Sequence, residues 1–228
     1  RLWRELVRAK LLNQAAVLEH LLQTAHTANA AKTAPASPEL EAAPAREHAH
    51  QKLLRLAERL KIDEAAAAEA QGARWYWPAL LGASFRRNPE GPWPNPLLNY
   101  TYALLRAGAA RALVASGLWL GLGVFHGNAY NPYPLADDLM EPYRPAADLL
   151  VLEVLAQAPE PEAGVRPLKK HLLLLLYKNL QLHNQQHSVA QALRHSAASL
   201  ASCYRGETTH LETPLLLPEQ FHPPRPQP

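Results

Sequence analysis

Apolar residues recur at helical spacing along most of the chain. Near its start they stand four or seven positions apart, at Trp3, Val7, Leu11, Leu18 and Leu22. This spacing puts them on one face of a helix over residues 1–23. Similar spacing predicts further helices over residues 48–60, 64–77, 97–116, 135–143, 146–157, 168–182 and 188–204. Strict alternation of apolar and polar residues, the pattern of a strand, is nearly absent. We therefore predict an all-α fold.

Proline, glycine and short polar residues mark the connections between these helices. Residues 24–47 turn to Ala, Pro, Thr and Ser and are predicted to form a flexible insert. Asp63 is placed to cap the helix that follows it, because its carboxylate can accept the free amide hydrogens of the first turn. Pro78 is expected to end or kink that helix. Four glycines predict an irregular stretch over residues 117–134.

The end of the chain differs in composition from the rest. Six prolines fall within residues 214–228, which predicts an extended segment. We therefore divide the chain into a helical catalytic domain, residues 1–204, and an extended Pro-rich tail, residues 205–228.

Chain length and cysteine content limit the possible classes of protein. The 228 residues are enough for a sizeable core. The longest apolar run, Leu172 to Tyr177, is far short of the ~18 residues that cross a bilayer, so no membrane association is expected. The single Cys203 excludes an internal disulfide and a multi-cysteine zinc site. A cytoplasmic location is expected. The start at Arg1, inside an amphipathic pattern, suggests a fragment of a longer protein.

Three acidic residues cluster at Asp137, Asp138 and Glu141. If this segment is helical, all three share a face. Like charges on one face repel, and a cation or an arginine is the usual reason to keep them together. The alternative is that Asp137 and Asp138 lie in a helix's first turn, where the helix dipole favours them.

His126 lies in the glycine-rich stretch, within Gly123-Val-Phe-His-Gly-Asn128. Its imidazole could complete a site made by carboxylates, and such mixed nitrogen and oxygen ligands suit Mn²⁺. Asn128 could orient the imidazole. A surface or simply hydrogen-bonded histidine is the alternative.

Glu69 continues a helix stripe that otherwise points inward, together with Ala73 and Trp77. An acidic residue on a core-facing stripe needs a partner. That partner could be a bound cation, or an ion pair with a residue such as Arg74.

Four segments together resemble a known family. They are Glu69 to Trp77, Asn99-Tyr-Thr-Tyr-Ala-Leu-Leu-Arg-Ala107, His126-Gly-Asn128 and Leu135-Ala-Asp-Asp-Leu-Met-Glu-Pro-Tyr-Arg-Pro145. They look like the CRISPR-associated spacer-acquisition integrase, the catalytic subunit of the bacterial adaptation complex, most of all in its type II versions. The resemblance runs from about residue 1 to residue 204. It does not include the family's small β-rich N-terminal domain, which we expect to be absent from this chain.

The resemblance implies a catalytic site and its ligands. Glu69, His126 and Glu141 match the family's three metal ligands, for Mg²⁺ or Mn²⁺, and Asp138 and Arg144 match an acidic and a basic position beside them. The implied reaction is attack by the 3′-hydroxyl of a captured spacer DNA on a phosphodiester of the CRISPR repeat. Nuclease activity would use water at the same site. The implied assembly is a homodimer on a small ferredoxin-like partner subunit, bound to double-stranded DNA of the spacer precursor and the repeat.

The charge of the chain permits DNA binding but does not by itself indicate it. The net charge is +3, and 16 of the 23 basic residues are arginine, whose guanidinium binds phosphate through two parallel hydrogen bonds. Each of three clusters could contact DNA or form a solvated charged surface. They are Arg1, Arg4 and Arg8; Arg86 and Arg87; and Arg166, Lys169 and Lys170.

Two other functions fit the residues without the resemblance. One is a non-catalytic helical DNA-binding or scaffold protein, in which the acidic cluster is merely a capped helix. The other is a helical enzyme that hydrolyses a small phosphate ester with a metal.

Overall fold

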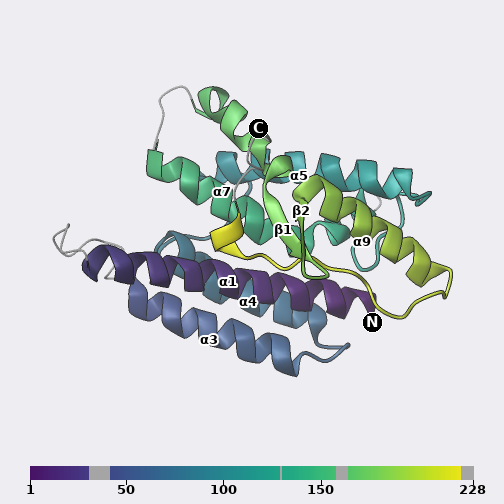
Figure 1. The fold of residues 1–228 in the computed structure, drawn as a ribbon, viewed down its shortest axis with the longest axis horizontal. Coiled ribbons are helices and arrows are strands. Elements are labelled where there is room, and N and C mark those ends of the chain that lie inside the picture. The colour runs from purple at the N-terminus through teal and green to yellow at the C-terminus, as the bar shows by residue number, and fades with distance from the viewer. Residues whose placement is uncertain (31–41, 129, 158–163, 222–228) are drawn as a thin grey trace.

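Helices make up most of the computed structural model (Figure 1), which describes residues 1–30, 42–128, 130–157 and 164–221. The α-helices are α1 (Leu2–Ala30), α3 (Ala43–Arg59), α4 (Ala65–Leu81), α5 (Asn95–Ala115), α6 (Pro134–Leu139), α7 (Arg144–Gln157), α8 (Lys169–Leu173) and α9 (Val189–Tyr204). Short 3₁₀ turns are η1 (Glu141–Tyr143), η2 (Arg166–Leu168), η3 (Leu174–Tyr177) and η4 (Pro218–Gln220). The predicted all-α class is confirmed, with one small hairpin added.

The helices form two groups that pack on each other. Figure 1 shows α1, α3 and α4 side by side in the lower half, and α5, α7 and α9 above them. α1 contacts both groups, since it also packs against η1, α6 and α7. The face predicted for α1 is buried as expected: Leu11 and Leu18 are completely inaccessible, and Trp3 is 7% exposed.

The insert predicted for residues 24–47 is shorter than expected. α1 continues to Ala30, and α3 begins at Ala43, so residues 24–30 and 43–47 are helical. Alanine favours the helix here. The hydroxyls of Thr24 and Thr27 also donate to the carbonyls of His20 and Gln23, at 3.0 and 2.8 Å, which keeps them compatible with the helix. Residues 31–41 lie outside the described residues.

The predicted cap of α4 is wrong, and the helix does not end at Pro78. Glu64, not Asp63, holds the N-cap position, and no side-chain hydrogen bond caps the helix. Pro78 lies inside the helix, which runs on to Leu81. Pro78 has no N–H group, so it removes one backbone hydrogen bond. It lies in the last turn of the helix, and its own carbonyl accepts a bond from Gly82 N at 3.0 Å.

The helix predicted over residues 168–182 is interrupted. After α8 and η3 the chain forms an antiparallel hairpin of β1 (Asn179–Leu182) and β2 (Gln185–Ser188). His183 and Asn184 both have positive φ, 51° and 60°, as a two-residue hairpin turn requires. The strand is short, so its alternation of Asn, Leu, Gln and Leu covers only four residues.

The described part of the tail lies along the molecule and is mostly irregular. Its Leu211, Leu216 and Phe221 are buried, and Leu215 forms a single bridge with Gln181 of β1. Residues 222–228 lie outside the described residues. In the described ranges we find no helix with the length and apolarity needed to cross a bilayer.

Candidate active site

A close approach of two helices brings Lys10 and Glu69 together. Gly72 of α4 lies directly against Leu11 of α1, where a β-carbon would overlap the Leu11 side chain. One turn before Gly72, the Glu69 carboxylate accepts from Lys10 Nζ at 2.7 Å. Lys10 is 8% exposed. The partner that Glu69 requires is therefore Lys10 on another helix, not Arg74 on its own.

Glu141 lies almost completely buried at the start of η1. Its Oε1 accepts from Arg144 Nε at 2.8 Å, and its Oε2 is 2.6 Å from Lys10 Nζ. Each oxygen of the Glu141 carboxylate therefore meets a positively charged group. Burial alone would raise the pKa of Glu141, but Arg144 and Lys10 outweigh it and lower this pKa. The carboxylate is therefore held in its charged form.

The charge of Lys10 is favoured by the same contacts. Burial would lower the pKa of Lys10, but the nearby Glu141 and Glu69 carboxylates outweigh it, and the pKa is raised. One ammonium group thus lies between the two carboxylates that were predicted as metal ligands.

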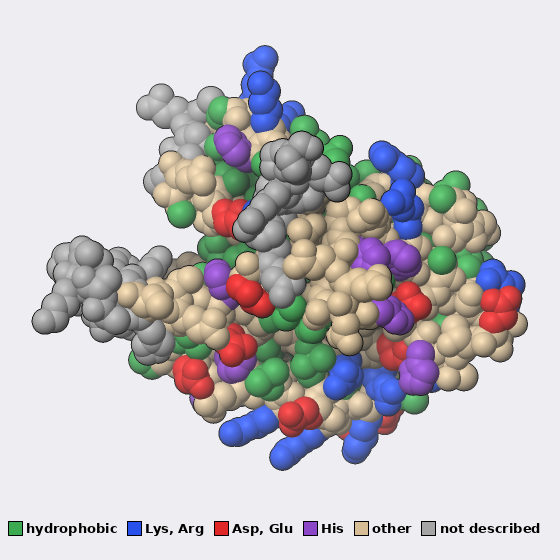
Figure 2. Space-filling view, viewed as in Figure 1, with side chains coloured by type: hydrophobic (Ala, Val, Ile, Leu, Met, Phe, Trp, Pro, Cys, Tyr) green, Lys and Arg blue, Asp and Glu red, His purple; other side chains and the backbone are tan. Residues whose placement is uncertain are grey.

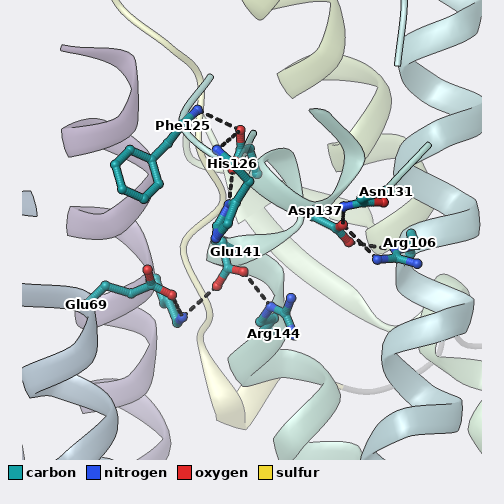
Figure 3. Close-up of polar contacts among 10 residues, drawn as sticks. Glu69, Arg106, Phe125, His126, Asn131, Asp137, Glu141 and Arg144 are labelled. Atoms are coloured by element: carbon teal, nitrogen blue, oxygen red, sulfur yellow. Dashed lines mark hydrogen bonds and ion pairs between the residues drawn. The ribbon is translucent and has the colours of Figure 1, made fainter. Parts of the chain in front are cut away.

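The prediction that Asp137, Asp138 and Glu141 share one face is wrong for Asp137. α6 ends at Leu139 and η1 begins at Glu141, and both Asp138 and Glu141 lie near His126. Asp137 binds both Nε and Nη2 of Arg106, at 2.6 and 2.7 Å. Figure 3 shows Asp137 and Arg106 well apart from Glu141.

His126 is held in place by Asp138. The fully buried Asp138 carboxylate contacts His126 Nδ1 and accepts from Phe125 N at 2.9 Å. The hydrogen bond between the Asp138 carboxylate and the His126 ring is the main reason that the pKa of His126 is raised, against the opposing effect of burial. Gly123 permits the loop to close here, since a β-carbon would overlap the His126 carbonyl oxygen and lie 2.8 Å from Asp138 Oδ2.

Asn128 does not orient the imidazole as predicted. Its Oδ1 accepts from Tyr130 N at 2.9 Å, within its own turn, and Asp138 makes the contact that positions the ring.

The aromatic packing around His126 was not predicted. Trp3 of α1 stacks on Phe125 with ring centroids 4.6 Å apart, and it meets His126 edge-on at 5.3 Å.

Glu69, His126 and Glu141 line one pocket of about 310 Å³. Figure 3 shows their functional groups turned toward the same space, from α4, the glycine-rich loop and η1. Within the described residues, however, no three His, Cys, Asp or Glu side chains are arranged as a ready metal site. The ammonium of Lys10 lies between the two glutamates.

The rest of the pocket contains a buried acid that was not predicted. Asp148 of α7 accepts from Tyr76 at 3.1 Å and from Tyr102 at 2.5 Å. Burial raises the pKa of Asp148 from its ordinary value of 3.8 to about 6, although both tyrosine hydrogen bonds oppose this. Arg144 stacks on the Tyr102 ring at 4.5 Å.

The predicted basic clusters lie in different places. Arg1, Arg4 and Arg8 line a groove of about 540 Å³ between α1 and residues 209–215. Arg87 lines the pocket with Glu141, whereas the exposed Arg86 donates to carbonyls of its own loop. Arg166, Lys169 and Lys170 are exposed at η2 and α8. Figure 2 shows Lys and Arg side chains at several separate places on one face, without a single basic patch there.

Sequence comparison identifies one relative that matches nearly the whole chain and another that matches about half of it. The CRISPR-associated endonuclease Cas1 of Neisseria meningitidis serogroup C is 34% identical over 219 residues, which are 96% of this chain and 63% of that protein. The CRISPR-associated endonuclease Cas1 1 of Pyrobaculum aerophilum is 35% identical over 47% of this chain and 36% of its own length.

Solved structures share the fold. A casposase bound to integration product has a TM-score of 0.70 at 20% identity, covering 97% of this chain and 64% of that one. A Cas1 protein from Thermotoga maritima has a TM-score of 0.63 at 16% identity, covering 91% and 67%. The chain thus spans a little under two thirds of the Neisseria relative and of the casposase. The model of the family described as CRISPR associated protein Cas1 matches residues 1–164, and the chain belongs to that family.

Proposed function

We propose that the chain is a divalent-metal-dependent DNA integrase and endonuclease of CRISPR adaptation. The observation that carries this proposal is the meeting of Glu69, His126 and Glu141 in one pocket, from segments 57 and 15 residues apart in sequence. The names of the relatives support it: the Neisseria protein is an endonuclease, and the casposase is bound to an integration product.

The side chains of this pocket fit a divalent cation. The buried Glu141 carboxylate lines the pocket, and Glu69 faces the same space. Asp138 engages Nδ1 of His126, which leaves Nε2 for a ligand. Two carboxylates and an imidazole suit Mn²⁺, and the carboxylates suit Mg²⁺. Glu69, His126 and Glu141 would hold the ion, which when bound stabilises negative charge on a phosphodiester.

The proposed reaction is a transesterification. The 3′-hydroxyl oxygen of the spacer forms a bond to a phosphorus of the repeat, while the bond from that phosphorus to the 3′-oxygen of the repeat strand breaks. The attacking hydroxyl loses its proton, and the leaving oxygen gains one. With water as the nucleophile, the same exchange is cleavage. Arg87 and Arg144 line the pocket and supply positive charge beside the phosphate.

The proposal also includes binding of DNA and of a protein partner. The groove lined by Arg1, Arg4 and Arg8 is the stretch of surface that we assign to the DNA backbone. We also propose a homodimer bound to a small ferredoxin-like subunit, in the cytoplasm. One structural neighbour is a Cas6-RT-Cas1–Cas2 complex, which supports a protein partner. Neutralising the three arginines is expected to flatten the dependence of DNA affinity on salt; an unchanged slope would remove the groove from the proposal.

Three substitutions test the catalytic site. We expect Glu69→Gln, His126→Asn and Glu141→Gln each to abolish joining of a labelled 3′ end to repeat DNA in Mn²⁺, with the helical circular dichroism retained. Glu153→Gln is the matched control, because Glu153 also pairs with a buried lysine, Lys178 at 2.7 Å, but does not line the pocket. Full activity in any of the three site variants contradicts the three-ligand assignment.

The same assays separate the other two functions. DNA binding that is unchanged in all three variants, without joining or cleavage by the unsubstituted chain, would favour a scaffold protein. Hydrolysis of nucleotide phosphates without activity on DNA would favour a phosphate-ester hydrolase.

A further inference from the structure

Lys10 is buried between two carboxylates, unlike the lysine of an ordinary surface ion pair. Its Nζ lies 2.7 Å from Glu69 Oε1 and 2.6 Å from Glu141 Oε2, and the residue is 8% exposed. A lysine rarely remains this buried without a partner. Its location follows from α1, where the neighbouring Val7 and Leu11 are completely buried and fix the helix in the core.

The contacts of Lys10 differ from those of a lysine that only supports the fold. Lys178 is equally buried, at 7% exposed, and pairs with Glu153 and the Phe221 carbonyl. Lys178 does not line the pocket of Glu69 and Glu141, whereas Lys10 does. The ammonium of Lys10 thus bridges two carboxylates, whereas that of Lys178 meets one carboxylate and one carbonyl.

A cation held by both glutamates would need the space that Lys10 Nζ now fills. A metal–carboxylate distance is about 2.0–2.6 Å for the relevant ions, close to the separation of Nζ from both carboxylates. Two positive charges cannot share that position, because their repulsion at such distances is large. The four-carbon stem of lysine is flexible enough to move the ammonium elsewhere in the pocket.

We propose that Lys10 is an internal competitor of the divalent cation: it bridges Glu69 and Glu141 in the metal-free protein and leaves them when the ion binds. This inference rests on the proposed metal site and adds the exchange step. In the metal-free protein Lys10 offsets the repulsion of two carboxylates that face each other. When Lys10 moves away, both carboxylates can bind the ion. Until then, Lys10 opposes metal binding.

The test measures Mn²⁺ binding and thermal stability in place of activity. In the 228-residue chain, Lys10→Met removes the charge and keeps most of the side-chain volume. We expect Mn²⁺, titrated by calorimetry or by the electron paramagnetic resonance of the free ion, to bind on the order of tenfold or more tightly than to the wild type. The metal-free melting temperature should fall, and Mn²⁺ should raise it more than in the wild type.

Three controls separate this role from a structural one. Lys178→Met should lower the melting temperature without changing Mn²⁺ affinity. Glu141→Gln should weaken Mn²⁺ binding, which locates the ion. Lys10→Gln, which keeps hydrogen-bonding capacity without the charge, replaces Lys10→Met if that variant is insoluble and should also bind Mn²⁺ more tightly.

The outcomes distinguish this inference from the proposed function. If Mn²⁺ binding depends on Glu141 but is unchanged or weaker in both Lys10 variants, Lys10 is not a competitor, and the metal site stands. If neither the wild type nor the Lys10 variants bind Mn²⁺, the exchange and the metal site are both wrong.

Discussion

The buried amide of Asn13 joins the beginning, the middle and the end of the chain. Asn13 is 1% exposed. Its Nδ2 donates to the carbonyls of Pro142 and Pro214, at 2.8 and 3.0 Å, and its Oδ1 accepts from Leu216 N at 2.9 Å. The substitution Asn13→Leu keeps nearly the same volume and removes all three hydrogen bonds.

The expected loss of stability follows from what remains unpaired. Each buried polar group left without its partner costs about 1–3 kcal/mol, and three groups lose Asn13. The neighbouring Leu215 is exposed, so water can reach part of this segment of the tail. The Pro214 carbonyl, in the same segment, can accept a hydrogen bond from that water. We therefore expect the free energy of unfolding to fall by about 2–4 kcal/mol, near the lower end of the summed range.

Equilibrium urea unfolding, followed by tryptophan fluorescence, measures this loss. Gln14→Met is the matched control, since Gln14 is the next residue, is 3% exposed and has an Oε1 without a hydrogen-bond partner in the described chain. Its replacement should change stability by less than about 1 kcal/mol or increase it. The reasoning fails if Asn13→Leu loses no more stability than Gln14→Met.

Three further substitutions test the surroundings of the site. Asp138→Asn should reduce DNA joining about 10–100-fold with the fold retained, because the carboxylate that orients His126 is lost; wild-type rates would contradict this. Between pH 4 and pH 7, Asp148→Asn should gain about 2 kcal/mol of unfolding free energy relative to wild type in urea unfolding. The pKa of Asp148 is raised from 3.8 to about 6, so its ionisation destabilises the fold as pH rises, and a constant difference would refute that origin. Gly123→Ala should impair joining and Gly127→Ala should not, since only at Gly123 would a β-carbon meet other atoms within 4 Å.

Helical spacing predicts most of the fold because each helix buries one continuous stripe. The stripe of α1 at Leu11 and Leu18 is an example. The errors fall where a local pattern is too short or ambiguous. Four residues of β1 give too little alternation to separate a strand from a helix end. Pro78 is tolerated only because of its place in the last turn, which depends on where the helix ends.

The sequence identifies candidate ligands but not their partners. The segments around Glu69, His126 and Glu141 resemble the family, and the structure brings these residues to one pocket. The sequence does not identify Lys10 as part of the site, because a single lysine beside an apolar stripe is usually solvated. Its partners are also 59 and 131 positions away in the chain. A charged residue between the buried Val7 and Leu11 was the available signal.

α1 links the stability of the fold to the geometry of the site. Trp3, Lys10 and Asn13 stand seven and three positions apart, so they share one face of the helix. Through that face α1 stacks on the loop beside His126, contacts both glutamates, and holds the carbonyl of Pro142 next to Glu141. The three candidate ligands come from three separate segments, and each of these segments touches α1. A shift of α1 would therefore move the ligands relative to one another, so substitutions on this face should change Mn²⁺ binding and unfolding free energy together.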